Sequence, residues 1–232
     1  MIIQGTSEIQ FGFLEVPCNL CLTDYKITKM AKTSGKIRTT GGFITRDSSY
    51  KGNISNIRSL NTVKDAQVYK ELKQGISRYH SALGVRQRNV KIGDLTSQTI
   101  GVHITSDGKS EMVVLNGKVF NKSKKDIEKR LNDAYKSGFL TVTNKPVQHA
   151  VTHELAHASW NKNLAGAKHK AAGKEIYSLY DKWDKDKKKK GYGEYATKNV
   201  NEFWAETVTK AIHGNSDKYT RKVKYIARKY KL

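Results

Sequence analysis

The segment of the chain with the clearest chemical meaning is His153-Glu154-Leu155-Ala156-His157. Two histidines four residues apart lie one turn apart on the same face of a helix, so their ring nitrogens can bind one cation together. Glu154 points about 100° around the helix from His153, which disfavours it as a ligand but lets it reach a water on the cation. A carboxylate in that position can act as a general base. The segment therefore predicts a metal-dependent hydrolytic site, with His153 and His157 as ligands and Glu154 as the base.

A catalytic zinc ion has three protein ligands and keeps a fourth position open for water. One subclass of such enzymes takes the third ligand from a histidine six residues beyond the second motif histidine, with a glycine halfway between. This chain has Trp160 at the glycine position and Asn163 at the histidine position, which excludes that subclass. The remaining solution is a glutamate on a later helix.

Two glutamates in the segment NVNEFWAET meet this requirement, because Glu202 and Glu206 are four residues apart and share one helix face. One carboxylate can bind the cation while the other accepts the N–H of a liganding imidazole and so fixes its tautomer. We assign Glu202 to Zn2+ and Glu206 to the imidazole. The spacing alone also allows the reverse assignment.

The motif HELAH, followed by Tyr195 and by Glu202 within EFWAE, resembles the catalytic domain of the anthrax lethal factor and Pro-Pro endopeptidase family. Members of that family are glutamate-liganded zinc metallopeptidases with a tyrosine seven residues before the liganding glutamate, which is the spacing of Tyr195 and Glu202 here. The resemblance is clear over residues 147–213 and says nothing about residues 1–55. It implies a zincin-like fold, Glu202 as the third zinc ligand, and Tyr195 facing the reacting carbonyl from a loop above the zinc.

The chemistry expected of Tyr195 follows from its phenol group. A phenol beside the cation can donate a hydrogen bond to the oxyanion that forms when water adds to a peptide carbonyl. Removing such a donor typically costs about 3–4 kcal/mol of transition-state stabilisation. Tyr192, three residues earlier, is the competing candidate for this role.

A third histidine, His149, precedes His153 by four residues and extends the same helical stripe. A ligand role, or contact with a ligand, is one interpretation of this spacing. We favour the other, in which His149 is a structural residue where the helix approaches the sheet.

Apolar spacing and turn signals along the chain indicate the elements that position these residues. The predicted elements are a helix at 62–82, strands at 90–92, 99–104 and 111–117, a hairpin turn at 106–108, a helix from Ser123 to Gly138, a strand at 140–143, and helices at 146–160, 170–189, 199–213 and 216–230. Gly214 is expected to close the helix before it with a left-handed cap. This order predicts an α+β fold with a small mixed sheet, in which the helical C-terminal half carries the zinc ligands.

The N-terminal quarter of the chain differs in composition from the rest. Residues 33–54 are rich in Ser, Thr and Gly, which is typical of a linker or an exposed loop. We therefore expect a partly extended N-terminal extension or linker region at 1–55 and a zincin-like metallopeptidase domain at 56–232. Cys18 and Cys21 form a Cys-x-x-Cys pair without the second half of a zinc ribbon, so we interpret them as reduced thiols.

The chain is strongly basic, with 43 Lys and Arg against 21 Asp and Glu and a net charge of +22. Such a charge attracts polyanions and acidic partners. An acidic or phosphorylated protein or peptide is therefore the expected substrate, and nucleic acid is a second candidate partner. The sequence contains neither an apolar run long enough for a membrane span nor, at its start, the pattern of a secretory signal. We expect a cytoplasmic or virion-associated protein.

These patterns together predict a zinc-dependent endopeptidase that hydrolyses a peptide bond by Glu154-assisted attack of water. The resemblance also implies an extended substrate that lies along the edge of the small sheet and pairs antiparallel with its last strand, for which residues 111–116 are the candidate. One alternative is a bacteriophage structural or head-assembly protein, because the Lys-, Asn- and Tyr-rich chain resembles zincin-like phage products, and its basic face would then bind DNA or a capsid partner. Another is a regulatory peptidase resembling the ImmA/IrrE group, whose usual motif after the zinc helix fits less well than EFWAE.

Overall fold

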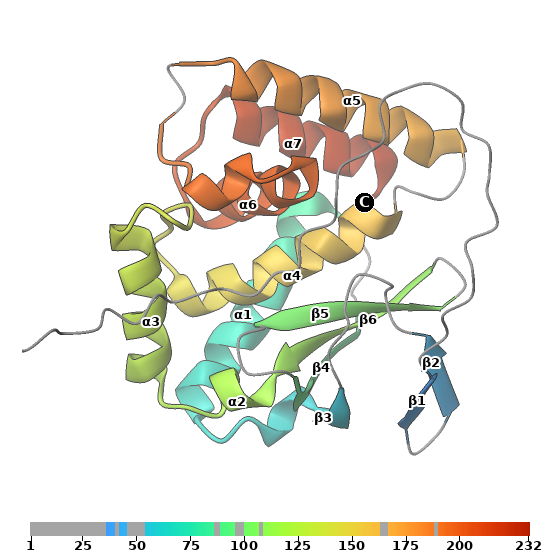
Figure 1. The fold of residues 1–232 in the computed structure, drawn as a ribbon, viewed down its shortest axis with the longest axis vertical. Coiled ribbons are helices and arrows are strands. Elements are labelled where there is room, and N and C mark those ends of the chain that lie inside the picture. Colours follow the sequence, from blue (N-terminus) through green and yellow to red (C-terminus); the bar gives the residue numbers. More distant parts are fainter. Residues whose placement is uncertain are drawn as a thin grey trace, which may run out of the picture.

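The computed structural model shows a small sheet that packs against a layered set of helices (Figure 1). The structure describes residues 36–39, 42–45, 54–85, 89–95, 100–106, 109–162, 167–187 and 190–232. Cys18, Cys21 and the centre of the predicted turn at 106–108 lie outside this part of the chain.

The elements confirm the predicted helices and three of the predicted strands, with ends that shift by a few residues. The strands are β1 (Lys36–Thr39), β2 (Gly42–Thr45), β3 (Ser55–Ser59), β4 (Asn89–Asp94), β5 (Gly101–Ser106) and β6 (Lys109–Asn116). The helices are η1 (Leu60–Thr62), α1 (Ala66–Leu83), α2 (Gly117–Phe120), α3 (Lys124–Lys136), α4 (Pro146–Lys162), α5 (Ala167–Asp184), η2 (Glu194–Thr197), α6 (Val200–His213) and α7 (Lys218–Tyr230). The chain is thus a mixed α/β protein with mostly helical content, and β3 is a strand that the sequence did not predict.

The main sheet is mixed and has the strand order β3-β4-β6-β5. Val113 of β6 lies opposite Val90 of the parallel strand β4 and opposite His103 of the antiparallel strand β5. Because β6 is paired on both sides, the prediction that residues 111–116 form the open edge of the sheet is wrong. The run Val113–Leu115 is apolar and fully buried, as suits an interior strand. Among the described strands, β5 is the terminal strand of the sheet on that side.

A separate hairpin lies in the segment that the composition predicted as a linker or loop. Strands β1 and β2 pair antiparallel there, with Lys36 opposite Thr45 and Thr39 opposite Gly42. Ser, Thr and Gly in this segment are therefore compatible with a two-stranded structure, which a reading of composition alone does not distinguish from a loop.

Helix α4 is the central helix of the molecule and lies between the sheet and the C-terminal helices (Figure 1). Every residue from Val147 to Trp160 is buried, and so is every residue of α6 from Glu202 to Ala211. A helix buried on all sides must supply partners for each polar side chain, because an unpaired buried polar group or charge is costly. The buried histidines and glutamates on α4 and α6 therefore require a specific explanation.

The segment from Leu140 to Thr143 does not form the predicted strand. The backbone N–H of Thr141 donates to the Glu206 side chain at 2.8 Å, and the N–H of Tyr195 donates to a carbonyl just before the segment, at 2.9 Å. The backbone at and just before this segment therefore forms hydrogen bonds with the Glu206 side chain and with the loop that carries Tyr195, and not with a neighbouring strand. These contacts join positions far apart in the sequence, which local propensity does not encode.

The end of α6 also differs from the prediction. Gly214 has φ −120° and ψ −165°, which is extended rather than left-handed backbone. Its N–H donates to the Lys210 carbonyl at 2.8 Å, so the last turn still closes. A left-handed glycine cap is a frequent way to end a helix but not a required one.

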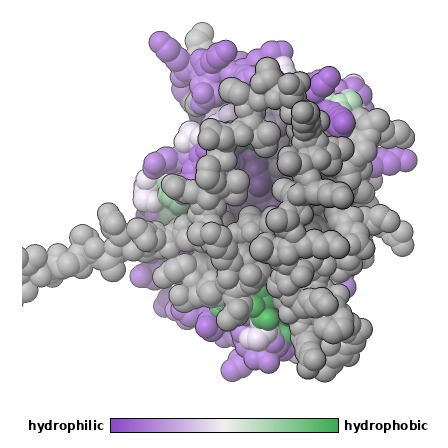
Figure 2. All heavy atoms as spheres, turned by 45° about the vertical axis from the view of Figure 1, so that its right-hand side comes forward, coloured by the Kyte–Doolittle hydropathy of each residue, from purple (hydrophilic) through white to green (hydrophobic). Residues whose placement is uncertain are grey.

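The described residues on the face drawn in Figure 2 are largely polar. Figure 2 shows that hydrophilic residues predominate among the described residues visible on one face. None of the helices in the described part of the chain is both long and apolar enough to cross a membrane.

Candidate metal centre

Three predicted ligand residues meet in the interior between α4 and α6. The Nε2 atoms of His153 and His157 lie 2.9 Å apart. Oε2 of Glu202 lies 3.3 Å from Nε2 of His153 and 3.2 Å from Nε2 of His157. All three side chains are buried. The structure therefore brings together the three groups that the spacing predicted as ligands, and their donor atoms could hold a metal ion.

A polar contact on the far side of each ring sets the direction of its lone pair. Nδ1 of His153 lies 2.9 Å from Oε1 of Glu206, and Nδ1 of His157 lies 3.0 Å from Oδ1 of Asn201. Each partner is an acceptor, so each ring carries its hydrogen on Nδ1 when it is neutral. Both Nε2 lone pairs then point into the same space as the Glu202 carboxylate. Such a set is stable only around a cation, either protons or a metal ion.

The ionisation of the cluster agrees with this requirement. Burial by itself lowers the pKa of His153, but Glu202 and Glu206 raise it to about 10. Burial raises the pKa of both carboxyl groups, but the facing histidines lower it well below its ordinary value. In the cation-free chain the carboxylates thus hold protons on the rings, and a metal ion that binds would displace those protons.

Glu206 occupies the position expected of the carboxylate that orients an imidazole. Its Oε1 forms an ion pair with Nδ1 of His153, and its Oε2 accepts from the backbone N–H of Thr141 at 2.8 Å. Glu202 is placed by the start of α6, where the Asn199 side chain caps the helix by accepting from the Glu202 N–H at 2.9 Å. This geometry favours Glu202 as ligand and Glu206 as ring partner over the reverse.

The Glu154 carboxylate lies against strand β5. A Cβ atom on Gly101 would lie 2.7 Å from Cγ and 2.9 Å from Cδ of Glu154, so the absence of a side chain at Gly101 makes room for the carboxylate. Burial raises the pKa of Glu154, while His157 and His153 partly offset the effect. A raised pKa brings a carboxylate closer to the range in which a general base also returns its proton.

Of the two candidate tyrosines, Tyr195 lies at the centre. It is buried in η2, and its ring centroid is 5.9 Å from that of His153. Burial raises the pKa of the Tyr195 phenol far above its ordinary value, and Glu202 adds to the effect, so the hydroxyl remains a donor at neutral pH. Tyr192 instead donates to Asp217, the residue that caps α7, at 3.0 Å.

The loop that carries Tyr195 is held by a close backbone approach. The Glu194 N–H donates to the Gly138 carbonyl at 2.9 Å, and the Gly193 N–H donates to Oγ1 of Thr141 at 3.0 Å. A Cβ atom on Gly193 would overlap the backbone between Phe139 and Thr141. Thr141 thus contacts both the tyrosine loop and Glu206.

A small cavity adjoins the reactive groups. It has a volume of about 20 Å³ and is bordered by His149, His153, Glu154 and Tyr195, and its remaining lining is apolar. A cavity of this size holds roughly one water molecule. The arrangement therefore offers a place for a solvent molecule beside a buried carboxyl group and a buried phenol.

Sequence reasoning missed several residues of the centre. Asn201 and Thr141 have no motif that marks them, because each acts through a contact distant in sequence. Gly193, between Tyr192 and Tyr195, has no room for a side chain, and no motif or spacing marks it in the sequence. His149 was noted but interpreted as structural.

Comparisons with protein-family models, with curated proteins and with solved structures found no match to this chain. The chemistry and geometry of the centre therefore provide the basis for a functional assignment.

Proposed function

We propose that the chain is a zinc-dependent endopeptidase with a zincin-like fold. The observation that carries the proposal is the convergence of two imidazole Nε2 atoms, from His153 and His157, with the Glu202 carboxylate, next to a buried Glu154. Two imidazoles and one carboxylate form a ligand set of catalytic zinc sites, which keep one further position open for water. Both the donor types and the fixed Nδ1 hydrogens fit Zn2+.

Zinc in this centre would polarise the substrate carbonyl and acidify a bound water. Glu154 then takes the proton of the attacking water and passes it to the leaving amine. Tyr195 donates its hydroxyl hydrogen to the oxyanion, and its raised pKa keeps that hydrogen in place. Glu206 and Asn201 hold the two liganding rings in orientation.

The terminal strand β5 is the proposed docking strand for the substrate. Among the four strands of the described sheet it pairs with β6 alone, and its residue Gly101 contacts Glu154. An extended peptide that adds to this edge would present its backbone to the centre. The net charge of +22 favours peptides with acidic side chains.

The Glu154→Gln variant tests the proposal because the amide has nearly the shape of the carboxylate but cannot accept the proton. We expect one zinc ion per chain in both proteins and cleavage of an unbiased peptide library by the wild type only. A loss of at least about 100-fold is expected of a missing general base. Equal cleavage by both proteins, or none by a zinc-loaded wild type, would contradict the proposal.

The large positive charge favours a second candidate, a phage structural or assembly protein that binds nucleic acid or a capsid partner. In that case the buried cluster would hold a structural metal ion. DNA binding or assembly that persists in Glu154→Gln, together with a wild type that cleaves no peptide, would support this reading.

A further inference from the structure

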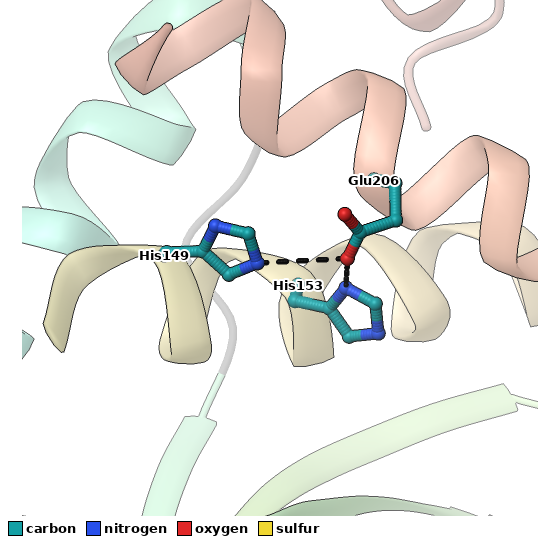
Figure 3. A group of neighbouring side chains, drawn as sticks. All are labelled: His149, His153 and Glu206. Atoms are coloured by element: carbon teal, nitrogen blue, oxygen red, sulfur yellow. Dashed lines mark ion pairs between the residues drawn. The ribbon is translucent and has the colours of Figure 1, made fainter. Parts of the chain in front are cut away.

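His149 lies one turn before His153 on α4 and faces the same carboxylate. Figure 3 shows both rings directed toward Oε1 of Glu206. Nε2 of His149 lies 3.5 Å from that oxygen, and Nδ1 of His153 lies 2.9 Å from it. The two rings are nearly parallel, with 10° between their planes and 6.1 Å between centroids.

The other side of the His149 ring is held by the loop before α4. Nδ1 of His149 lies 3.4 Å from Oγ1 of Thr143, which in turn lies 3.0 Å from the hydroxyl of Tyr135. The ring of Tyr135 also packs at 5.5 Å from the His149 ring. One direction of donation fits these distances: Tyr135 donates to Thr143, Thr143 donates to Nδ1 of His149, and the hydrogen of His149 is then on Nε2, the ring nitrogen 3.5 Å from Glu206.

His149, His153 and Glu206 also have the donor atoms of a second metal group. Two contacts oppose that interpretation. Oε1 of Glu206 already lies 2.9 Å from Nδ1 of His153 in an ion pair, and Oε2 already accepts from the Thr141 N–H. A cation in this group would have to come between Glu206 and Nδ1 of His153 and so break their ion pair.

We infer that His149 is a positioning residue of the proposed cation site, acting through Glu206 rather than as a ligand. With Thr141 holding one carboxylate oxygen and His149 facing the other, Glu206 is fixed in the rotation that suits Nδ1 of His153. The Nε2 lone pair of His153 is thereby aimed at the point shared with His157 and Glu202. This inference rests on the proposed function only in that the centre binds a divalent cation.

A matched pair of substitutions separates this role from a purely structural one. His149→Gln places an amide donor near the position of Nε2, within reach of Glu206. His149→Asn keeps an amide near the position of Nδ1, beside Thr143, but is too short to reach Glu206. Both are polar and uncharged, so they differ mainly in the contact that the inference concerns.

The dissociation constant for Zn2+, measured on the full chain by competition with a chelator, tests the inference. Outer partners of metal ligands typically contribute about 10–100-fold to affinity, so we expect about tenfold weaker binding in His149→Asn and a change of less than about threefold in His149→Gln. The Co2+ absorption bands of the Gln variant should match the wild type, and those of the Asn variant should shift. Unfolding of the cation-free proteins reports any structural effect separately.

Equal Zn2+ affinity and equal Co2+ spectra in the two variants would overturn the inference. So would two cations per wild-type chain, with the second lost in both variants, since that result would make His149 a ligand. None of these measurements uses a substrate. A chain that binds one cation as expected but cleaves no peptide would contradict the proposed peptidase alone, whereas a wild type that binds no cation would overturn both.

Discussion

Two groups of charged side chains show how differently ionic contacts behave inside the molecule and at its surface. Between α5 and α7, Glu175 accepts from Lys229 at 2.6 Å and from Tyr230 at 2.8 Å, with Lys222 at 3.3 Å. The lysines of this group remain exposed. Between α4 and α6, Glu202 and the groups that face it are buried.

In both groups the neighbouring side chains lower the carboxyl pKa, but burial opposes them much more strongly in the interior. Lys229 and Tyr230 lower the pKa of Glu175 to about 2 while water still screens the charges. In the interior the histidines must first overcome burial, which raises the pKa of Glu202. A buried ionic cluster therefore stabilises the fold little by itself and is better explained by the cation that it can bind.

Removal of the interior carboxylates has the largest expected effect. Glu202→Ala should lose zinc on dialysis, because one of three ligands is gone. Glu206→Ala should retain zinc with about 10–100-fold weaker affinity, because only the support of His153 is lost. Zinc content after dialysis and a chelator competition measure both. The opposite ranking would exchange the roles of the two glutamates.

Two glycines provide the next comparison, Gly193 beside the interior cluster and Gly173 in α5. Gly193→Ala should destabilise the chain by about 1–3 kcal/mol, because the added methyl overlaps a neighbouring backbone. Gly173→Ala in α5 meets nothing within 4 Å and should stabilise by about 0.5–1 kcal/mol through helix propensity. Urea unfolding measures both changes.

The Gly193 substitution should also affect turnover through the tyrosine loop. Tyr195→Phe should retain zinc and stability but lower the turnover number by about 100-fold, and Gly193→Ala should lower it in the same direction by displacing the loop. A normal turnover number in Tyr195→Phe would show that Tyr195 has no part in the chemistry. A lower turnover number in Gly193→Ala would then need another cause.

The surface group should show the smallest effect. Glu175→Gln is expected to destabilise the chain by less than about 1 kcal/mol at neutral pH, and by less in high salt. The folded pKa of Glu175 is below its unfolded value near 4.5, so its contribution is present above about pH 4.5 and is lost as the pH falls toward 2. Unfolding curves of both proteins across this range should therefore converge at low pH. A large difference in the free energy of unfolding that does not depend on salt would contradict the view that the surface group contributes little to stability.

The sequence predicted the parts of the centre that local spacing encodes. The i, i+4 spacing of His153 and His157 within α4, and of Glu202 and Glu206 within α6, places the side chains on one helix face whatever the tertiary fold. The helices themselves followed from apolar periodicity for the same reason. Roles for these residues remain predictions, whereas their convergence is a property of the structure.

The parts that the sequence did not reveal depend on contacts between distant segments. Thr141 meets Glu206 across 65 positions, and Gly193 meets Thr141 across 52. The same long-range pairing replaced the predicted strand at 140–143. Strand order is equally non-local, which is why the interior position of β6 could not be read from its apolar run alone.

The most direct test of the central claim is the zinc K-edge X-ray absorption spectrum of the full chain loaded with one equivalent of Zn2+. The account predicts two imidazole ligands together with oxygen ligands, at about 2.0–2.2 Å, and no sulfur in the first coordination sphere. Sulfur at about 2.3 Å would place the metal at Cys18 and Cys21 rather than between α4 and α6. That result, or a chain that retains no zinc, would contradict the assignment of His153, His157 and Glu202 as a catalytic metal site.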